Sequence, residues 1–258
     1  MIVSLAWEDW ERLARIGNVA SRDGARPILA AIFIEAEVDD ARVRATATDS
    51  YKLATVSVPA EIDDDEPPIL MPARAARTIT TAFRQLASIA LGSQWASLLG
   101  GEKNLSLTYT TEPRPQVYVE FNIGARYIGS LATDLVDGKF PNYRVLLHKP
   151  DLQPYTRSTL TRKRKDEIAD YIAAQFGRTY NPDECSKDSL LDIYDDFAAK
   201  PIERSIGLDP DHLNALMRTT LTTYPHPLRI EMFGQLRPIF LTNPSDKDWL
   251  GIQMPVRT

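Results

Sequence analysis

The sequence predicts an α+β protein made of repeated βαβββ units. Short β-branched runs follow one another in groups, and a stretch with helical spacing precedes each group. The chain has 258 residues, which is enough for one large domain or two of ordinary size. Its composition, 43% hydrophobic and 25% charged, is typical of a globular protein and excludes a disordered chain, a fibre or a coiled coil.

The first predicted helix covers about residues 6–18. Its apolar residues Trp10, Leu13 and Ala14 share one face at the spacing of helical turns. Acidic residues near its start and arginines near its end suit the helix dipole. We expect Ser4 to cap its N-terminus, because a serine hydroxyl can accept a hydrogen bond from a free backbone N–H of the first turn.

Strands and a second helix follow this first helix. Short β-branched runs predict consecutive antiparallel strands at 28–38, 43–49 and 52–58. The second helix is expected to open at Met71-Pro72, since proline is favoured in a first helical turn. Its apolar stripe consists of Ile79, Ala82, Phe83 and Leu86. Alternating apolar residues then predict further strands at 105–109, 117–123 and 125–136.

The rhythm breaks at residues 150–204 and returns afterwards. This segment is polar and has helical spacing at 166–176 and 189–200. The pattern then resumes with a helix from Pro210 to about Leu221 and with strands at 228–233, 238–242 and 249–254. We therefore expect two domains, residues 1–148 and 149–258, with 150–204 as a divergent helical segment of the second.

Several classes of protein are excluded by what the sequence contains. No run reaches the roughly 18 apolar residues of a membrane span, and the N-terminus has no targeting pattern. The single cysteine, Cys185, excludes a disulfide framework and fits a reducing cytoplasm. The histidines, His148, His212 and His226, are too widely spaced for a His-rich metal site. We expect neither a metal nor a cofactor.

Three short segments stand out from the rest. Residues 47–54 are ATDSYKLA, residues 136–144 are VDGKFPNYR, and residues 254–258 are MPVRT. In the same order and at similar spacing, they resemble the ATDGHRLA, VDGRFPDYR and MPMRL segments of bacterial sliding clamps, the beta subunits of the replicative DNA polymerase. Upstream, Arg26-Pro27-Ile28-Leu29 resembles the approach to the strand that precedes the first of these segments.

The resemblance implies a DNA-clamp fold, with helices on the inner face and antiparallel sheets outside. Residues 1–148 correspond to the middle domain of such a clamp, and residues 205–258 to the C-terminal half of its third domain. The family's first domain has no counterpart in the chain. The Gly-His-Arg of the signature is replaced by Ser50-Tyr51-Lys52.

The resemblance also implies a ring that holds double-stranded DNA by encirclement, without reading its sequence. The net charge of −5 argues against DNA binding over the whole surface, but helical arginines can attract phosphate weakly enough to permit sliding. Alternatively, these arginines are ordinary solubility features of helix surfaces, and the basic run at 162–165 is open to the same two interpretations. The expected DNA-facing residues are Arg12, Arg15, Arg74, Arg77, Arg84 and Arg218.

Clamps of this family bind short linear peptides of polymerases and of the clamp loader in an apolar cleft between the second and third domains. Leucine, valine and methionine suit an apolar anchor, and the basic residues could pair with polar groups of a peptide. Without the resemblance, Leu29, Leu53 and Ile252 would be interpreted as core strand residues. Carried over by motif position, the cleft consists of Leu29, Thr48, Tyr51, Lys52, Leu53, Pro141, Val145, Ile252, Met254, Pro255, Val256 and Arg257.

Ring closure depends on the number of domains. Clamps close with six domains and this chain has the size of two, so we expect a homotrimer joined head to tail. We expect a cytoplasmic, nucleoid-associated protein of bacteriophage or mobile-element type, with no membrane contact and no active site of its own.

Two other functions remain open at this stage. A metal-dependent nuclease could use the acidic runs at 63–66 and 192–196, although P-loop, GxGxxG, GxSxG and HExxH motifs are missing from the sequence. A monomeric adaptor or decoy would keep the clamp fold and bind polymerase peptides without forming a ring.

Overall fold

The computed structural model describes residues 2–63, 67–92, 103–110, 114–148, 156–160, 208–220, 228–233 and 237–255. The chain forms two compact units. Unit 1 consists of Met1–Asn142 with Arg218–Leu221, and unit 2 consists of Tyr143–Met217 with Thr222–Thr258.

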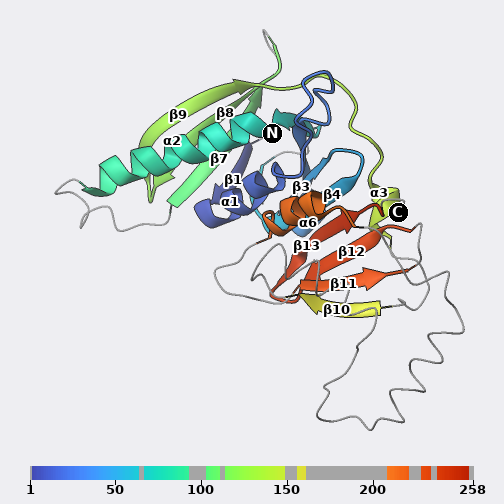
Figure 1. Ribbon diagram of the computed structural model, residues 1–258. Coiled ribbons are helices and arrows are strands. Elements are labelled where there is room, and N and C mark those ends of the chain that lie inside the picture. Colours follow the sequence, from blue (N-terminus) through green and yellow to red (C-terminus); the bar gives the residue numbers. More distant parts are fainter. Residues whose placement is uncertain are drawn as a thin grey trace, which may run out of the picture. The chain divides into compact units, whose positions relative to one another are not determined.

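Unit 1 contains two sets of antiparallel strands (Figure 1). The first is a sheet with the order β5 (Glu61–Ile62), β1 (Ile2–Ala6), β7 (Lys103–Thr110), β8 (Gln116–Ile123) and β9 (Arg126–Asp134). In the second set the order is β4 (Lys52–Pro59), β3 (Arg42–Thr48), β2 (Ala31–Glu37) and β6 (Ile69–Pro72). The 3₁₀ turn η1 (Val38–Asp40) connects β2 to β3.

Two helices cover these strands. The helix α1 (Trp7–Ile16) contacts β3 and β4, and α2 (Ala73–Gly92) lies across β8 and β9 (Figure 1). The helices also contact each other, since the Trp10 Nε1–H donates a hydrogen bond of 3.1 Å to Thr80 Oγ1. Trp7 stacks on Phe83 with ring centroids 4.1 Å apart. Aromatic packing therefore fixes the helix pair on the core.

The alternation predicted for β7 and β8 is present in the structure. Leu105 and Leu107 on β7 are fully buried, as are Val117, Val119 and Phe121 on β8. Because successive strand residues point to opposite faces, each strand buries one face, while the other face is half-buried in β7 and partly exposed in β8. The α+β class with antiparallel sheets is thus confirmed.

Unit 2 has a sheet with the order β10 (Thr156–Leu160), β11 (Leu228–Met232), β12 (Ile239–Asn243) and β13 (Asp246–Gln253). It also contains the short helix α3 (Arg144–Leu147) and the helix α6 (Pro210–Met217). The helix α6 packs on β13 at Gly251. A Cβ atom at Gly251 would lie 2.9 Å from the Trp249 ring and 3.3 Å from Leu216 Cδ2, so only glycine permits this approach.

Several predicted element boundaries are wrong. Ser4 lies within β1, where its hydroxyl hydrogen-bonds to that of Ser106, and α1 begins after Ala6 without a side-chain cap. Met71-Pro72 belongs to β6, because Met71 pairs with Ile32 of β2 before the helix can begin. The C-terminal helix ends at Met217, earlier than expected.

The segment 150–204 was expected to be helical, but Thr156–Leu160 is a strand. It pairs along its whole length with β11, and this pairing supplies the hydrogen bonds that a helix would otherwise provide. The predicted helices at 166–176 and 189–200 lie outside the described residues. Among the residues that are described, no helix has both the length and the apolar character needed to span a bilayer.

Candidate functional site

The turn between β3 and β4 is held by its own side chains. Asp49 Oδ1 accepts hydrogen bonds from the backbone N–H groups of Tyr51 and Lys52, at 3.0 and 2.9 Å. Thr48 Oγ1 donates to the Lys52 carbonyl at 2.8 Å and accepts from the Ser50 N–H at 3.2 Å. Lys52 Nζ also forms an ion pair with Asp49 Oδ2. Such side-chain bonds replace the missing strand pairing at a turn.

This turn adopts an unusual backbone conformation. Ser50 has φ of 83°, in the left-handed region that favours glycine. The conformation reverses the chain sharply and leaves the next side chain, Tyr51, 59% exposed. The turn thereby presents an aromatic ring to solvent beside the half-buried Lys52.

A second segment, residues 136–142, packs against the approach to β2. Gly138 has φ of +141°, and a Cβ atom there would lie 2.6 Å from Ile28 Cδ1. Phe140 stacks on Phe33 with ring centroids 4.9 Å apart. These contacts bring the segments that carry Leu29 and Pro141 side by side.

The β2–β3 register adds the Thr48 turn to the same end of the strands. Phe33 pairs with Thr46, so the start of β2 and the end of β3 lie together. Unit 1 thus brings together the segments that carry six of the predicted cleft residues. These residues differ in solvent exposure: Leu53 is 2% exposed, Thr48 is also buried, and Pro141 is exposed.

The remaining predicted cleft residues belong to unit 2. Val145 on α3 is 65% exposed, and its neighbour Leu146 is 40% exposed. Ile252 on β13 is 2% exposed, and Met254 and Pro255, just after this strand, are half-buried. Val256 and Arg257 lie outside the described residues.

The end of β13 is fixed by a hydrogen bond to the start of α6. Gln253 Nε2 donates to the Asp209 carbonyl at 3.1 Å. The Asp209 carboxylate in turn caps α6, since Oδ1 accepts from the N–H groups of Asp211 and His212 at 2.8 and 3.1 Å. This anchor sets the position within unit 2 from which Met254 and Pro255 continue.

The predicted DNA-facing arginines fall into different environments. Arg12 bonds to Asp9 at 3.2 Å, and Arg84 contacts Glu11 Oε1 at 2.5 Å. Arg15 is half-buried in the last turn of α1, and Arg218 is exposed directly after α6. The two arginines of the first turns of α2, Arg74 and Arg77, are exposed.

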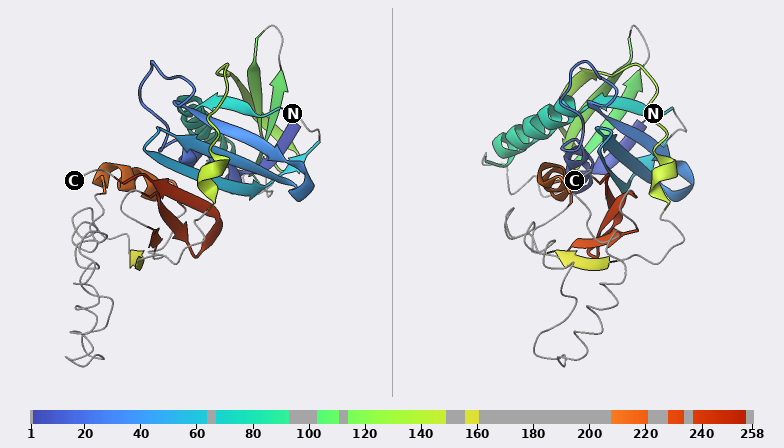
Figure 2. Two further views of the ribbon diagram at one scale, coloured as in Figure 1. Left: turned by 90° about the vertical axis from the view of Figure 1, so that its right-hand side faces the viewer. Right: turned by 45° about the vertical axis from the view of Figure 1, so that its right-hand side comes forward.

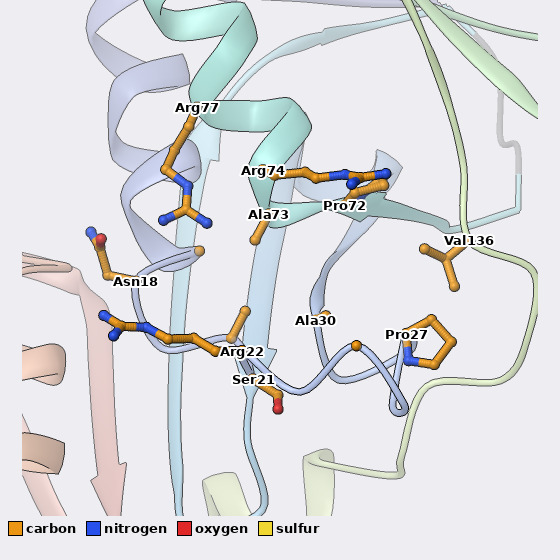
Figure 3. A pocket seen from close by; sticks show the side chains of 13 residues that line it. Asn18, Ser21, Arg22, Pro27, Ala30, Pro72, Ala73, Arg74, Arg77 and Val136 are labelled. Atoms are coloured by element: carbon orange, nitrogen blue, oxygen red, sulfur yellow. The ribbon is translucent and has the colours of Figure 1, made fainter.

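Arg74 and Arg77 line a cavity of about 460 Å³ together with Arg22 from the loop after α1 (Figure 3). This loop appears as a blue extension in Figure 2. In the described part of the chain, none of the three guanidinium groups forms a hydrogen bond or ion pair, and no carboxylate lines the cavity.

Of the acidic runs considered for a nuclease, only Asp63 is described, and it is exposed. The rest of 63–66 and the run 192–196 lie outside the described residues, as does the basic run 162–165. The described residues contain no group of three or more His, Cys, Asp or Glu side chains that could hold a metal ion.

Comparison with known proteins decides the family. Residues 11–142, more than half of the chain, match the model of the DNA polymerase III beta subunit, central domain. The chain belongs to the DNA polymerase III beta subunit family. The prediction made from the three motifs is therefore confirmed, and the matched residues contain the Ser50 turn, Gly138 and all three cavity arginines. Among curated proteins, no sequence matches the chain.

Solved structures of beta clamps share the fold. The DNA polymerase III subunit beta of Borrelia burgdorferi is 12% identical with a TM-score of 0.63, and 100% of this chain covers 64% of that one. The sliding clamp of Bacillus subtilis is 15% identical with a TM-score of 0.62 and the same coverage. The beta subunit of Thermotoga maritima is 13% identical, with a TM-score of 0.63 and coverage of 100% and 66%. The chain thus has a beta-clamp fold and spans about two thirds of the length of these clamps.

The motif comparison with beta clamps missed two features of the site. Arg22 lies in a loop, so a search for basic residues on helices did not include it. Leu146 extends the exposed apolar surface of Val145. In the sequence this pair of adjacent apolar residues could equally have belonged to the core. The signal that could have identified Leu146 was the position of the pair directly after the VDGKFPNYR segment.

Proposed function

We propose that this protein is a DNA sliding clamp, a ring-shaped processivity factor that encircles duplex DNA and tethers a replicative polymerase. The observation that carries the proposal is the beta-clamp fold, which matches clamps of known structure along the full chain. The family match at residues 11–142 supports the same role in DNA replication. In this proposal the chain performs no catalytic step.

The ring forms by head-to-tail association of identical chains. Each chain contributes two clamp domains, residues 1–148 and 149–258, so three copies supply the six domains of a closed ring. The edge strand β9 supports this assembly, because it has only β8 as a partner among the described strands. Its outer row of backbone N–H and C=O groups can pair with a strand of another copy.

The ring attracts DNA without fixing it in place. Unpaired arginines such as Arg74 and Arg77 provide sequence-independent attraction to phosphate, while Arg12 and Arg84 already have carboxylate partners. Encirclement supplies the residence time, so the phosphate contacts can stay weak enough for sliding.

For the tether, we propose the cleft residues that the motifs predict. Tyr51 and Val145 provide exposed apolar contacts to a peptide of the polymerase or clamp loader, whereas the charge of Lys52 is already paired with Asp49. Leu53 and Ile252 are each buried in the core of their own unit. A labelled peptide containing leucine and phenylalanine should bind, and Tyr51→Ala and Val145→Glu should each weaken binding at least about tenfold. Ile89→Glu, at another exposed apolar residue, is the matched control.

The ring is tested by mass and by topology. Light scattering should give a species near three times 29.0 kDa, about 87 kDa. On linear duplex DNA with biotin at both ends, protein added before streptavidin should be retained after a high-salt wash, and protein added after it should not. A ring needs an open end to thread, whereas electrostatic binding does not.

Two results would contradict the proposal. Equal retention in both orders of addition would show ordinary surface binding. A persistent 29.0 kDa monomer that still binds the peptide would instead support the adaptor function, in which the clamp fold presents a cleft without a ring.

A further inference from the structure

The cavity between the loop after α1 and the start of α2 concentrates positive charge without a counter-charge. Arg22, Arg74 and Arg77 line it, and none has a hydrogen-bonding or ionic partner among the described residues. Several other arginines of unit 1 have a carboxylate partner, as shown by Arg44 with Glu37 and by Arg84 with Glu11, both at 2.5 Å. The three cavity arginines lie close together without such a partner.

The loop contains one carboxylate, and it is turned to other partners. Asp23 Oδ1 accepts a hydrogen bond from the Ala25 N–H at 2.9 Å, and Oδ2 lies 3.7 Å from Arg26 Nε. Asp23 does not line the cavity. Like charges that share a concave surface repel each other unless an anion enters, so an anion would lower the electrostatic energy there.

The lining indicates which anion would fit. Arg22 and Arg77 extend toward the same end of the cavity, beside Asn18, whereas Arg74 extends over Pro72 (Figure 3). Guanidinium groups bind phosphate oxygens through two parallel N–H donors. The other walls are mostly small residues, without an aromatic ring among the described lining residues on which a base could stack. Such a site recognises a phosphate group and ignores the base attached to it.

We infer that this cavity binds a phosphate group between Arg22 and Arg77. Two sources share this chemistry, a phosphate of the DNA backbone and a small free phosphate compound. The backbone source rests on the proposed function and would make the cavity a weak contact for successive phosphates as the DNA slides past. The free source would make it a ligand site that does not depend on DNA.

Two binding measurements on the full chain distinguish these sources. Calorimetry with inorganic pyrophosphate reports the free source. Fluorescence anisotropy with a labelled duplex lacking terminal phosphates, repeated over a range of salt concentrations, reports the backbone source. The variants are Arg22→Ala, Arg77→Ala and Arg22→Lys, which keeps the charge but loses the planar fork. The matched control is Arg26→Ala, which removes the same charge from the same loop outside the cavity.

Arg22→Ala and Arg77→Ala should each lower the affinity about tenfold for the probe that binds, and Arg22→Lys should lower it less. On duplex DNA the same alanine variants should also make the slope of log affinity against log salt shallower by about one. Arg26→Ala should change affinity less than twofold for either probe. If the two alanine variants lose affinity only for the duplex, the backbone is the source of the phosphate. If they lose affinity only for pyrophosphate, the source is a free phosphate compound.

Failure of this inference can be separated from failure of the proposed function. If the duplex binds and Arg26→Ala weakens it as much as Arg22→Ala does, a general positive field is acting and the cavity site is refuted, while DNA binding stands. If no duplex binding or threading occurs, the proposed function fails, and the pyrophosphate titration alone decides the cavity site. Absence of binding by both probes refutes it.

Discussion

Of the turns in unit 1 that have a positive φ, those at Gly138 and Ser50 reach it with different kinds of residue. At Gly138 the chain uses glycine, and the missing side chain leaves room for Ile28. At Ser50 the chain uses an L-residue in the left-handed region, and backbone N–H groups of the turn donate hydrogen bonds to Thr48 Oγ1 and Asp49 Oδ1. Strain of this kind persists only where the surrounding contacts determine the conformation.

The comparison shows what each segment can tolerate. At Gly138 there is no space for a side chain, so any substitution there must disturb the segment. The conformation of the Ser50 turn depends on specific hydrogen-bond acceptors. We therefore expect it to persist when Ser50 is replaced but not when the acceptor side chains around it are removed. The sliding-clamp signature has glycine where this chain has Ser50. This turn therefore differs from the signature, and its own hydrogen bonds stabilise the left-handed conformation of the serine.

Gly138→Ala should have the largest effect and would sharpen the comparison most. Strain at the positive φ and contact with Ile28 Cδ1, 2.6 Å from the new Cβ, should together lower the free energy of unfolding by about 2–4 kcal/mol. Urea denaturation measures this change. In an Ile28→Ala background the cost of Gly138→Ala should fall by at least about 1 kcal/mol, because the steric part is gone. An equal cost in both backgrounds would assign the whole effect to φ.

Asp49→Ala should come next. It removes the acceptor of two backbone N–H groups and the partner of Lys52, and should cost about 1–2 kcal/mol in unfolding free energy. Asp49→Asn keeps an acceptor oxygen and should cost less. Asp39→Ala, an exposed aspartate in η1, is the control and should stay within about 0.5 kcal/mol. If Asp49→Ala were as mild as this control, the turn would not depend on its side chains.

Ser50→Gly should have the smallest effect and the opposite sign. Relief of left-handed strain is worth about 1–2 kcal/mol, and the greater flexibility of glycine in the unfolded chain offsets about 0.4–1 kcal/mol of it. We expect a net stabilisation of about 0.5 kcal/mol, seen as a rise in Tm of about 1–2 °C. A lower Tm would mean that the Ser50 side chain contributes more than its backbone strain costs.

Local patterns predicted most of the fold. Alternation in β8 and the apolar stripe of α2 depend on burial of one face, which the sequence displays directly. Ser4 and Met71-Pro72 were assigned to helix starts because caps and prolines favour such positions. Strand pairing with β7 and β2 decided otherwise, and pairing between distant segments leaves no local signal.

The candidate site was predictable only in part, for the same reason. Motif position identified the turn that exposes Tyr51, but it could not distinguish Tyr51 from the buried Leu53 two residues later. Helical spacing grouped Arg12 and Arg84 with Arg77. The carboxylates that engage the first two, and the loop that brings Arg22 to the third, become visible only when separate segments are packed together.

The buried indoles have a practical consequence for spectroscopy. Trp7 and Trp10 lie in the core of unit 1, and Trp249 is buried in unit 2. With Trp95→Phe as a background, a further Trp249→Phe change leaves fluorescence from unit 1 alone, and Trp7→Phe with Trp10→Phe leaves that from unit 2. Coincident melting curves would show that the units unfold as one cooperative system, and separate curves would give each unit a stability of its own.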